Sequence, residues 1–274
     1  MATEKKIDKQ IKIIGCGKMA SAILDAWLKK SVSHLNIHVD DPKPSEWLIE
    51  KKKYGLNVNT QEDIPFDYCF IGVKPQSLDE IKLKLKALSK KNVTFVSMLA
   101  GIKLDRLESI IGRDESIVRI MPNLPAEILK GVTAVKENEK VKPNQSKNLI
   151  TLLEAFGEIV KFSEESKFDA VTAISGSGPA YIFLIAELMT EVGVNLGLSQ
   201  DEAFKLVKHT IDGAGSLIVN SSLEPQKLRK NVTSPGGTTH EALAIMMNKE
   251  SGLPKIFSAA INAAAKKSKE LSKV

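Results

Sequence analysis

Apolar residues in the first 162 positions occur in short runs, and segments with apolar residues at helical spacing separate these runs. The runs are rich in β-branched and aromatic residues, which favour strands. They predict strands at Ile11–Ile14, Leu35–Val39, Asn57–Asn59, Tyr68–Val73, Val93–Ser97, Ile117–Met121, Gly131–Val135 and Glu158–Phe162. The segments between them predict helices at Ala22–Trp27, Lys43–Lys53, Ser77–Leu88 and Asn144–Phe156. This alternation predicts an α/β fold with a doubly wound, mostly parallel sheet and helices on both faces.

From Ser166 onward, helical periodicity replaces the strand pattern. It predicts helices at Lys167–Ile174, Pro179–Leu196, Gln200–Val219, Thr239–Lys249 and Pro254–Leu271. We therefore expect two domains, residues 1–162 and residues 163–274, the second all-helical. The first half of Pro179–Leu196 is nearly apolar on every side, so this helix must be buried all round. A domain of so few helices is too small to cover it, which predicts a homodimer formed through this domain.

A glycine-rich turn follows the first predicted strand and opens the first helix. Its residues fit the spacing G-x-G-x-x-A, and the stretch consists of Gly15, Cys16, Gly17, Lys18, Met19 and Ala20. Gly15 permits a sharp bend, Gly17 lets a pyrophosphate approach the backbone, and Ala20 lets the helix pack close to the strand. Asp40 ends the second strand, where a carboxylate can meet an adenosine ribose. These features favour a dinucleotide site over an ordinary glycine-rich turn.

Four loops lie where predicted strands end, at Gly15–Gly17, Lys74–Gln76, Ser97–Gly101 and Met121–Asn123. The carboxyl ends of parallel strands share one edge of a sheet, and ligands of such sheets bind there. We expect these loops to form one cleft. Its candidate cofactor contacts, beyond the glycine turn, are Val73, Lys74, Pro75, Ser97, Gly101 and Asn123.

Two segments of the second domain carry candidate chemistry. In Ser175–Tyr181, small residues precede Pro179, which suits a first helical turn; they would admit either another helix or a nicotinamide ring. In Asn231–Glu241, Thr238 and Glu241 have the spacing of a capping box. Gly236 and Gly237 precede that helix, and consecutive backbone N–H groups at a helix N-terminus form a nest for a carboxylate. His240 beside them is expected to be a packing or surface residue.

Composition excludes several classes of protein. The net charge is +6, and arginine occurs only at positions 106, 113, 119 and 229, so lysine supplies most of the positive charge. With 5% aromatic residues, this indicates solvated helix faces rather than a nucleic-acid site. No apolar run reaches the length of a membrane span, and the polar residues 1–10 contain no signal-peptide core. Cys16 and Cys69 lack metal-ligand spacing, so we expect reduced thiols, a cytoplasmic protein and no metal site.

The motifs together resemble those of the pyrroline-5-carboxylate reductase family, in order and over nearly the whole chain. They are Gly15–Ala20, Val73–Gln76, Met121–Asn123, Ser175–Tyr181 and Val232–Thr239. The resemblance implies a Rossmann domain followed by a helical dimerisation domain, with dimers that often assemble further into decamers. It implies an oxidoreductase that passes hydride from NADPH or NADH to the C=N carbon of 1-pyrroline-5-carboxylate, giving L-proline in the last step of proline biosynthesis. Reduction of a protonated imine requires neither a metal nor a covalent nucleophile.

The resemblance also implies roles for individual residues. Gly236, Gly237 and Thr238 hold the substrate carboxylate, and Thr239 hydrogen-bonds the ring nitrogen and relays its proton. The ring pocket is lined by Val232 and Pro179. The ribose and nicotinamide end of the cofactor is contacted by Lys74, Pro75 and Asn123.

Two departures and two alternatives remain. Leu124 follows Asn123 where the family often has threonine, and Asp40-Asp41 stands where enzymes that prefer NADPH usually offer Ser, Asn or Arg. A carboxylate there repels a 2′-phosphate, so we expect NADH to serve at least as well as NADPH. A β-hydroxyacid dehydrogenase is disfavoured because no lysine follows Gly178 at the required spacing. A non-catalytic dinucleotide-sensing protein is disfavoured because the Ser234–Thr239 loop is intact.

Overall fold

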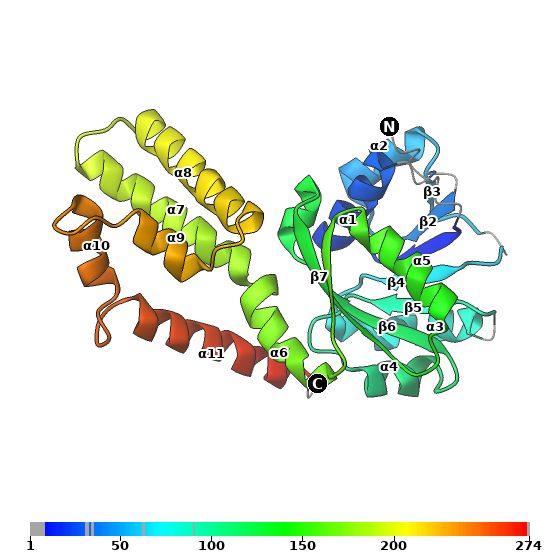
Figure 1. Ribbon diagram of the computed structural model, residues 1–274. Coiled ribbons are helices and arrows are strands. Elements are labelled where there is room, and N and C mark those ends of the chain that lie inside the picture. The colour runs from blue at the N-terminus through cyan, green and yellow to red at the C-terminus, as the bar shows by residue number, and fades with distance from the viewer. Residues whose placement is uncertain (1–8, 31–32, 34–35, 62–63, 90, 273–274) are drawn as a thin grey trace. The chain divides into compact units, whose positions relative to one another are not determined.

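The computed structural model describes residues 9–30, 33, 36–61, 64–89 and 91–272, and Figure 1 shows its elements. Most of the polar N-terminal segment and Leu35, the predicted start of the second strand, lie outside the described residues. Contacts divide the chain into two units. Unit 1 comprises Met1–Ser177 and Ala264–Val274, and unit 2 comprises Gly178–Ala263.

Unit 1 is built on an eight-stranded sheet with the order β3-β2-β1-β4-β5-β6-β7-β8. Its strands are β1 Ile11–Ile14, β2 Ile37–Asp40, β3 Asn57–Val58, β4 Tyr68–Ile71, β5 Thr94–Ser97, β6 Ser116–Met121, β7 Gly131–Glu137 and β8 Gly157–Lys161. All neighbouring pairs are parallel except β6 with β7. The predicted doubly wound, mostly parallel sheet is therefore confirmed, and the strand order reverses between β1 and β4.

Helices cover both faces of this sheet (Figure 1). They are α1 Lys18–Lys29, α2 Glu46–Lys53, α3 Lys82–Leu88, α4 Leu104–Ile111, α5 Pro143–Glu154 and the short α6 Phe168–Val171. One buried cluster joins α1, α2 and α5 to the sheet around Trp27 and Phe156, and a second joins α3 and α4 around Phe95 and Leu107. Each face is thus sealed by its own apolar core, because strands buried on both sides need partners on both sides.

Two helical segments of unit 1 differ from the prediction. No helix was predicted at α4, although its buried face, including Leu104 and Leu107, has helical spacing. The predicted helix Ser77–Leu88 begins as two 3-10 turns, Pro75–Ser77 and Asp79–Ile81, and becomes α-helical only at Lys82. Pro75 fixes its φ in the first turn after the strand, which favours a short turn there over a regular helix.

Unit 2 is helical throughout. It contains α7 Gly178–Asn195, α8 Gln200–Asn220, α9 Pro225–Asn231, α10 Thr238–Met246 and most of α11 Leu253–Leu271. Of these helices, α9 was not predicted from the sequence. A capping box does occur, but at Ser199 and Glu202 before α8, where the serine hydroxyl accepts from the N–H of Glu202. The box predicted at Thr238 and Glu241 is wrong, because Gly237 is the N-cap of α10 and has no side chain to cap with.

The predicted domain boundary near Ser163 differs from the division by contacts, which falls after Ser177. The last strand does end at Lys161, but α6 continues to pack on unit 1 through the buried Phe168. A π-helical turn, Thr172–Gly176, then joins α6 to α7 without a break, so the helix continues through Ser177 and Gly178. The end of α11 also returns to unit 1.

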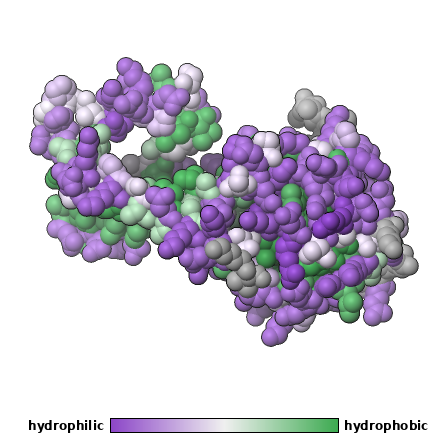
Figure 2. Space-filling model, turned by 90° about the horizontal axis from the view of Figure 1, so that it is seen from below, coloured by the Kyte–Doolittle hydropathy of each residue, from purple (hydrophilic) through white to green (hydrophobic). Residues whose placement is uncertain are grey.

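The helices of unit 2 expose many large apolar side chains (Figure 2). On α7 alone these are Ile182, Phe183, Leu184, Leu188, Met189, Val192 and Val194. Among the described residues one helical run, Glu165–Asn195, is long and apolar enough by length and composition to cross a membrane. No unbroken apolar run reaches this length, as the sequence indicates, because charged residues such as Glu165, Lys167 and Glu187 interrupt this helical run.

Candidate active site

The glycine turn connects β1 to α1 as predicted. Gly15 has φ +83°, a left-handed conformation that glycine adopts without strain, and its N–H donates to the Asp40 carbonyl at 2.8 Å. Helix α1 begins with Gly17 as its N-cap and no side-chain cap. A Cβ on Gly17 would meet no atom within 4 Å, so open space faces this glycine. The first N–H groups of α1 thus stand beside a backbone that an anion can approach closely.

At the point where the strand order reverses, two glycines pack against each other. A Cβ on Gly15 would lie 2.8 Å from the backbone nitrogen of Val73, and one on Gly72 would lie 2.5 Å from the carbonyl oxygen of Gly15. A Cβ on Gly72 would also lie 3.2 Å from the Cβ of Ala20. Gly15 and Ala20 therefore serve close packing within the protein, while Gly17 leaves room for a ligand.

A cavity of about 930 Å³ opens beside this turn within unit 1. It is lined by Cys16, Gly17, Lys18, Ser21, Ala22, Asp25, Asp41, Lys43, Ser45, Trp47, Leu124, Glu127 and Ile128. Cavities of this size accommodate cofactors. The predicted residues Cys16, Gly17 and Lys18 are among the lining residues, and so is Leu124, where the sequence departs from the family pattern. Trp47, and Glu127 and Ile128 of the 3-10 turn Leu124–Ile128, were missed because nothing in their local pattern indicates a ligand.

The two aspartates after β2 have different environments. The carboxylate of Asp40 pairs with the ammonium of Lys12 at 2.6 Å and with that of Lys84 at 3.6 Å, and Asp40 does not line the cavity. The carboxylate of Asp41 does line it and accepts the N–H of Cys16 at 2.7 Å. Of the two carboxylates, that of Asp41 therefore lines the cavity, while that of Asp40, the predicted ribose contact, pairs with lysines. Sequence alone could not separate them, since the choice depends on where β2 ends.

None of the predicted cofactor contacts in the loops after β4, β5 and β6 lines this cavity. Val73, Lys74 and Pro75 follow β4 at the carboxyl edge, with Lys74 exposed. Ser97 is fully buried, and its hydroxyl accepts the N–H of Leu99 at 3.4 Å. That hydroxyl stabilises the turn after β5.

Gly101 and Asn123 have structural roles that the sequence did not reveal. A Cβ on Gly101, which has φ +79°, would lie 2.9 Å from the Cβ of Leu271 at the end of α11. The side-chain oxygen of Asn123 accepts the N–H of Val132 at 2.9 Å, and its amide nitrogen donates to the Ser175 carbonyl at 3.4 Å. Asn123 therefore fastens the π-helical turn to the end of β6.

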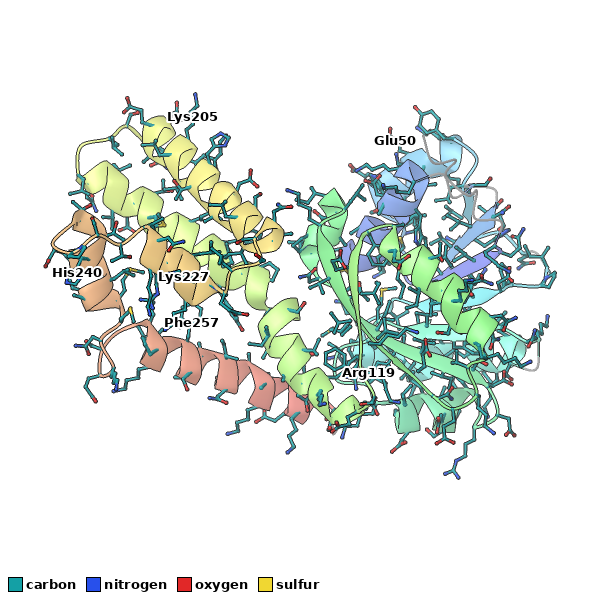
Figure 3. The ribbon with its side chains drawn as sticks, viewed as in Figure 1. Glu50, Arg119, Lys205, Lys227, His240 and Phe257 are labelled. Atoms are coloured by element: carbon teal, nitrogen blue, oxygen red, sulfur yellow. The ribbon has the colours of Figure 1, made fainter. Side chains whose placement is uncertain are left out.

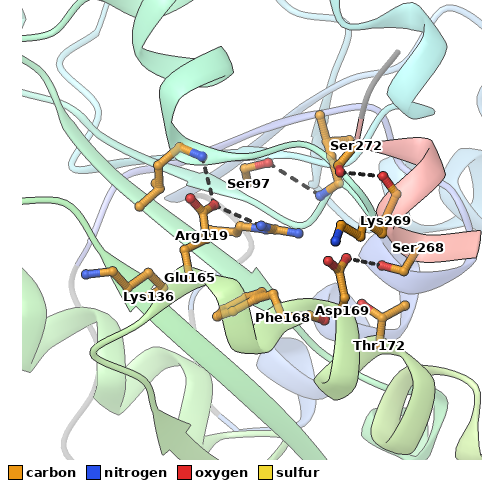
Figure 4. Close-up of polar contacts among 12 residues, drawn as sticks. Ser97, Arg119, Lys136, Glu165, Phe168, Asp169, Thr172, Ser268, Lys269 and Ser272 are labelled. Carbon is orange, nitrogen blue, oxygen red and sulfur yellow. Dashed lines mark hydrogen bonds and ion pairs between the residues drawn. The ribbon is translucent and has the colours of Figure 1, made fainter. Parts of the chain in front are cut away.

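A buried ion pair fastens α6 to the sheet (Figure 4). The guanidinium of Arg119 on β6 donates to the carboxylate of Glu165 at 2.8 Å, and its Cζ lies 4.6 Å from the ring centroid of Phe168. The same carboxylate oxygen accepts the N–H of Leu104 at 2.8 Å. Nearby, the hydroxyl of Ser268 on α11 donates to Asp169 at 2.7 Å. These contacts hold the start of the long helix and the end of α11 on unit 1.

Among the described residues of unit 2, the loop before α10 has backbone donors without an acceptor, but the N–H of Gly237 is not one of them. Gly236 has φ +68°, which favours glycine. The N–H of Gly237 donates to the Ser234 carbonyl at 3.1 Å, so it is not available to a ligand. Within the described part of the chain, the N–H groups of Gly236, Thr238 and Thr239 have no hydrogen-bond acceptor. The predicted pair Gly236–Gly237 is thus replaced by donors on either side of Gly237.

The other predicted substrate residues of unit 2 lie near helix termini. Pro179 occupies the first turn of α7, and Val232 ends α9 with an exposed side chain. Thr239 is half-buried in the first turn of α10, whereas the adjacent His240 is exposed (Figure 3). His240 therefore agrees with the expectation of a surface residue.

Neither thiol is disposed to act as a nucleophile. Burial raises the pKa of Cys16, and burial raises the pKa of Cys69 to about 12. Both cysteines are free. Among the described residues, no group of three or more His, Cys, Asp or Glu could hold a metal ion.

A Rossmann unit with an open glycine turn, joined to a helical unit, defines a two-domain dinucleotide-dependent oxidoreductase. A family model described as pyrroline-5-carboxylate reductase dimerisation matches residues 165–271. Another, described as NADP oxidoreductase coenzyme F420-dependent, matches residues 10–101. The chain belongs to the pyrroline-5-carboxylate reductase family.

Relatives match over nearly the full length. The chain is 34% identical to the pyrroline-5-carboxylate reductase of Pseudomonas aeruginosa, over 96% of this chain and 97% of the relative. The structure of a pyrroline-5-carboxylate reductase from Coxiella burnetii is similar with a TM-score of 0.87 and 31% identity, covering 97% of this chain and 99% of that one. The Plasmodium falciparum enzyme with NADP bound has a TM-score of 0.84 and 26% identity, covering 97% and 99%. The predicted family is confirmed.

Proposed function

We propose that the chain reduces 1-pyrroline-5-carboxylate to L-proline with NADH or NADPH, the last step of proline biosynthesis. The observation that carries the proposal is the pairing, in one chain of this family, of two backbone sites for anions. One is the start of α1 at Gly17, with open space before it, and the other is the start of α10 at Gly236–Thr239. The first suits a pyrophosphate and the second suits the carboxylate of a small imino acid.

The residues fit a nicotinamide dinucleotide. The cavity of about 930 Å³ begins at Cys16, Gly17 and Lys18 and includes the carboxylate of Asp41, as a pyrophosphate followed by a ribose requires. The N–H groups of α1 would bind the pyrophosphate, and the exposed Lys18 adds positive charge beside it. When bound, the dinucleotide supplies the hydride.

The α10 loop holds the substrate in this proposal. The N–H groups of Gly236 and Thr238 bind the carboxylate, with the N–H of Thr239 and the positive end of the α10 dipole adding to them. The hydroxyl of Thr239 hydrogen-bonds the ring nitrogen and relays its proton, while Pro179 and Val232 contact the ring. An iminium carbon is already electrophilic, so the protein's task is to fix its orientation and keep its nitrogen protonated.

We further propose that two chains pair through unit 2. The apolar side chains exposed on α7 require a cover, and residues 165–271 match a dimerisation model. A second copy of the chain covers this face better than a bilayer does, because α8 packs along α7 and carries polar residues. Assembly of dimers into decamers and a cytoplasmic location complete the proposal, and the free thiols of Cys16 and Cys69 agree with a reducing compartment.

Oxidation of NADH and of NADPH, followed by absorbance with 1-pyrroline-5-carboxylate added, tests the reaction. We expect Thr239→Val to lower kcat by about a hundredfold, as loss of a proton-transfer group does. Gly236→Ala strains a residue at φ +68° and should raise the substrate KM while cofactor binding stays unchanged. The matched control is Thr151→Val, an exposed threonine whose hydroxyl donates to the Lys147 carbonyl on α5. Folded protein that binds cofactor without turnover would favour the dinucleotide-sensing alternative.

A further inference from the structure

The carboxylate of Asp41 is held by backbone donors at the edge of the dinucleotide cavity. Its Oδ2 accepts the N–H of Cys16 at 2.7 Å, and its Oδ1 accepts the N–H of Lys43 at 2.8 Å. Each oxygen can accept further hydrogen bonds, so the carboxylate retains an acceptor for each of two neighbouring hydroxyls. Asp41 therefore presents a fixed acceptor beside the turn that would bind the pyrophosphate.

The side chain of Asn59 fixes the backbone of Asp41. It has φ +54°, and its N–H donates to the Val39 carbonyl at 2.8 Å. Its side-chain oxygen accepts the N–H of Asp41 at 2.9 Å, and its side-chain nitrogen donates to the carbonyl of Asp41 at 2.8 Å. This amide thus satisfies both backbone groups of Asp41 at once. An asparagine tolerates the left-handed conformation that places its amide there.

We propose that Asp41, positioned by Asn59, makes this chain select the dinucleotide without a 2′-phosphate, so that NADH is its preferred hydride donor. The inference rests on the proposed dinucleotide site and concerns its specificity. A ribose with a free 2′-hydroxyl can donate to the Asp41 carboxylate. A 2′-phosphate offers no such donor and brings up to two negative charges against a fixed anion.

Other charges of the cavity do not reverse this choice. Lys43 lines the same cavity and would attract a phosphate. Because its ammonium is flexible and strongly hydrated, this attraction stabilises a bound 2′-phosphate less than the fixed Asp41 carboxylate destabilises it. Asp25 also lines the cavity, and its carboxylate pairs with Lys29 at 2.6 Å on α1. Asp25 therefore offers a test of whether total charge or the fixed position of Asp41 decides selectivity.

The experiment measures dissociation constants of NADH and NADPH by calorimetry on the full-length protein, without substrate. We expect NADH to bind about tenfold more tightly, since one unfavourable charge contact of about 1.4 kcal/mol is a factor of ten. Asp41→Ser should weaken NADH, tighten NADPH and bring the ratio close to one. Asp25→Asn removes the same charge from the same cavity and should leave the ratio unchanged.

Asn59→Gly tests the positioning role, because glycine keeps φ +54° without strain while both side-chain bonds are lost. We expect the NADH preference to fall severalfold and KM for NADH to rise, with kcat at saturating NADH unchanged. The proposal is overturned if the wild type binds NADPH as tightly as NADH, or if Asp25→Asn changes the ratio as much as Asp41→Ser. Since no turnover is needed for the calorimetry, a failure of the proposed reaction is distinguished from a failure of this inference.

Discussion

The Arg119–Glu165 pair allows an asymmetric prediction about stability. Both groups lie in unit 1, but the side chain of Arg119 is 3% exposed and that of Glu165 is 20% exposed. Removing one partner of a buried pair leaves the other charge without compensation, and the penalty is larger for the charge that cannot reach water. We therefore expect Glu165→Ala to be more damaging than Arg119→Met.

The magnitudes follow from the contacts. Glu165→Ala leaves a buried guanidinium unpaired and removes the acceptor for the Leu104 N–H, which together cost about 3–5 kcal/mol of unfolding free energy. Arg119→Met keeps most of the buried volume, and the Glu165 carboxylate can turn toward water and still accept from Leu104. That variant loses the ion pair and the contact with Phe168, about 1–3 kcal/mol. The double variant leaves no unpaired buried charge and should recover about 1–2 kcal/mol relative to Glu165→Ala.

Urea unfolding followed by the fluorescence of the fully buried Trp27 reports on unit 1. All variants must be compared at one protomer concentration, because association contributes to apparent stability. A larger loss for Arg119→Met than for Glu165→Ala would contradict the argument from exposure. A double variant less stable than Glu165→Ala would show that the unpaired arginine is not the source of the cost.

Three further outcomes are expected. Burial raises the pKa of Cys69 from 9.0 to about 12, so the stability that the neutral thiol contributes is present below pH 9 and is lost as the pH rises toward 12. Between pH 8 and 10, the unfolding free energy of the wild type in urea melts should therefore fall by about 1 kcal/mol more than that of Cys69→Ala. Gly101→Ala places a methyl against Leu271 and should lower the melting temperature by several degrees, whereas Gly213→Ala, with open space around it, should not. Phe183→Asp should give monomers in size-exclusion light scattering, while Leu83→Asp on α3 should stay dimeric.

Periodicity predicted the sheet well because its strands are buried on both faces and read as apolar runs. The strand pattern from Tyr68 and the glycine turn at Gly15 are local signals, and both are present in the structure. What the sequence could not supply was long-range packing. The boundary near Ser163 misses that Phe168 and Ser268 bind to unit 1, because such contacts join positions far apart in the chain.

The site shows the same limit at the level of single residues. Residue types and spacing identified the Gly17 turn and the loop at Gly236. They could not tell which of Asp40 and Asp41 faces the cavity, since Lys12 on the neighbouring strand pairs with the first of these carboxylates. Nor could they show that the N–H of Gly237 is already used by Ser234, because turn geometry decides which donors stay free.

The return of α11 to unit 1 has a consequence for how the protein is made. Unit 1 contains both Met1–Ser177 and Ala264–Val274, so its first and last parts are separated by all of unit 2 during synthesis. Ser268, whose hydroxyl donates to Asp169, and Leu271, which packs on Gly101, both lie on α11. They are therefore translated only after every other helix. The nascent nucleotide-binding unit is therefore finished last, although its sheet is translated first, and the chain completes it after its dimerisation helices are already exposed to partners.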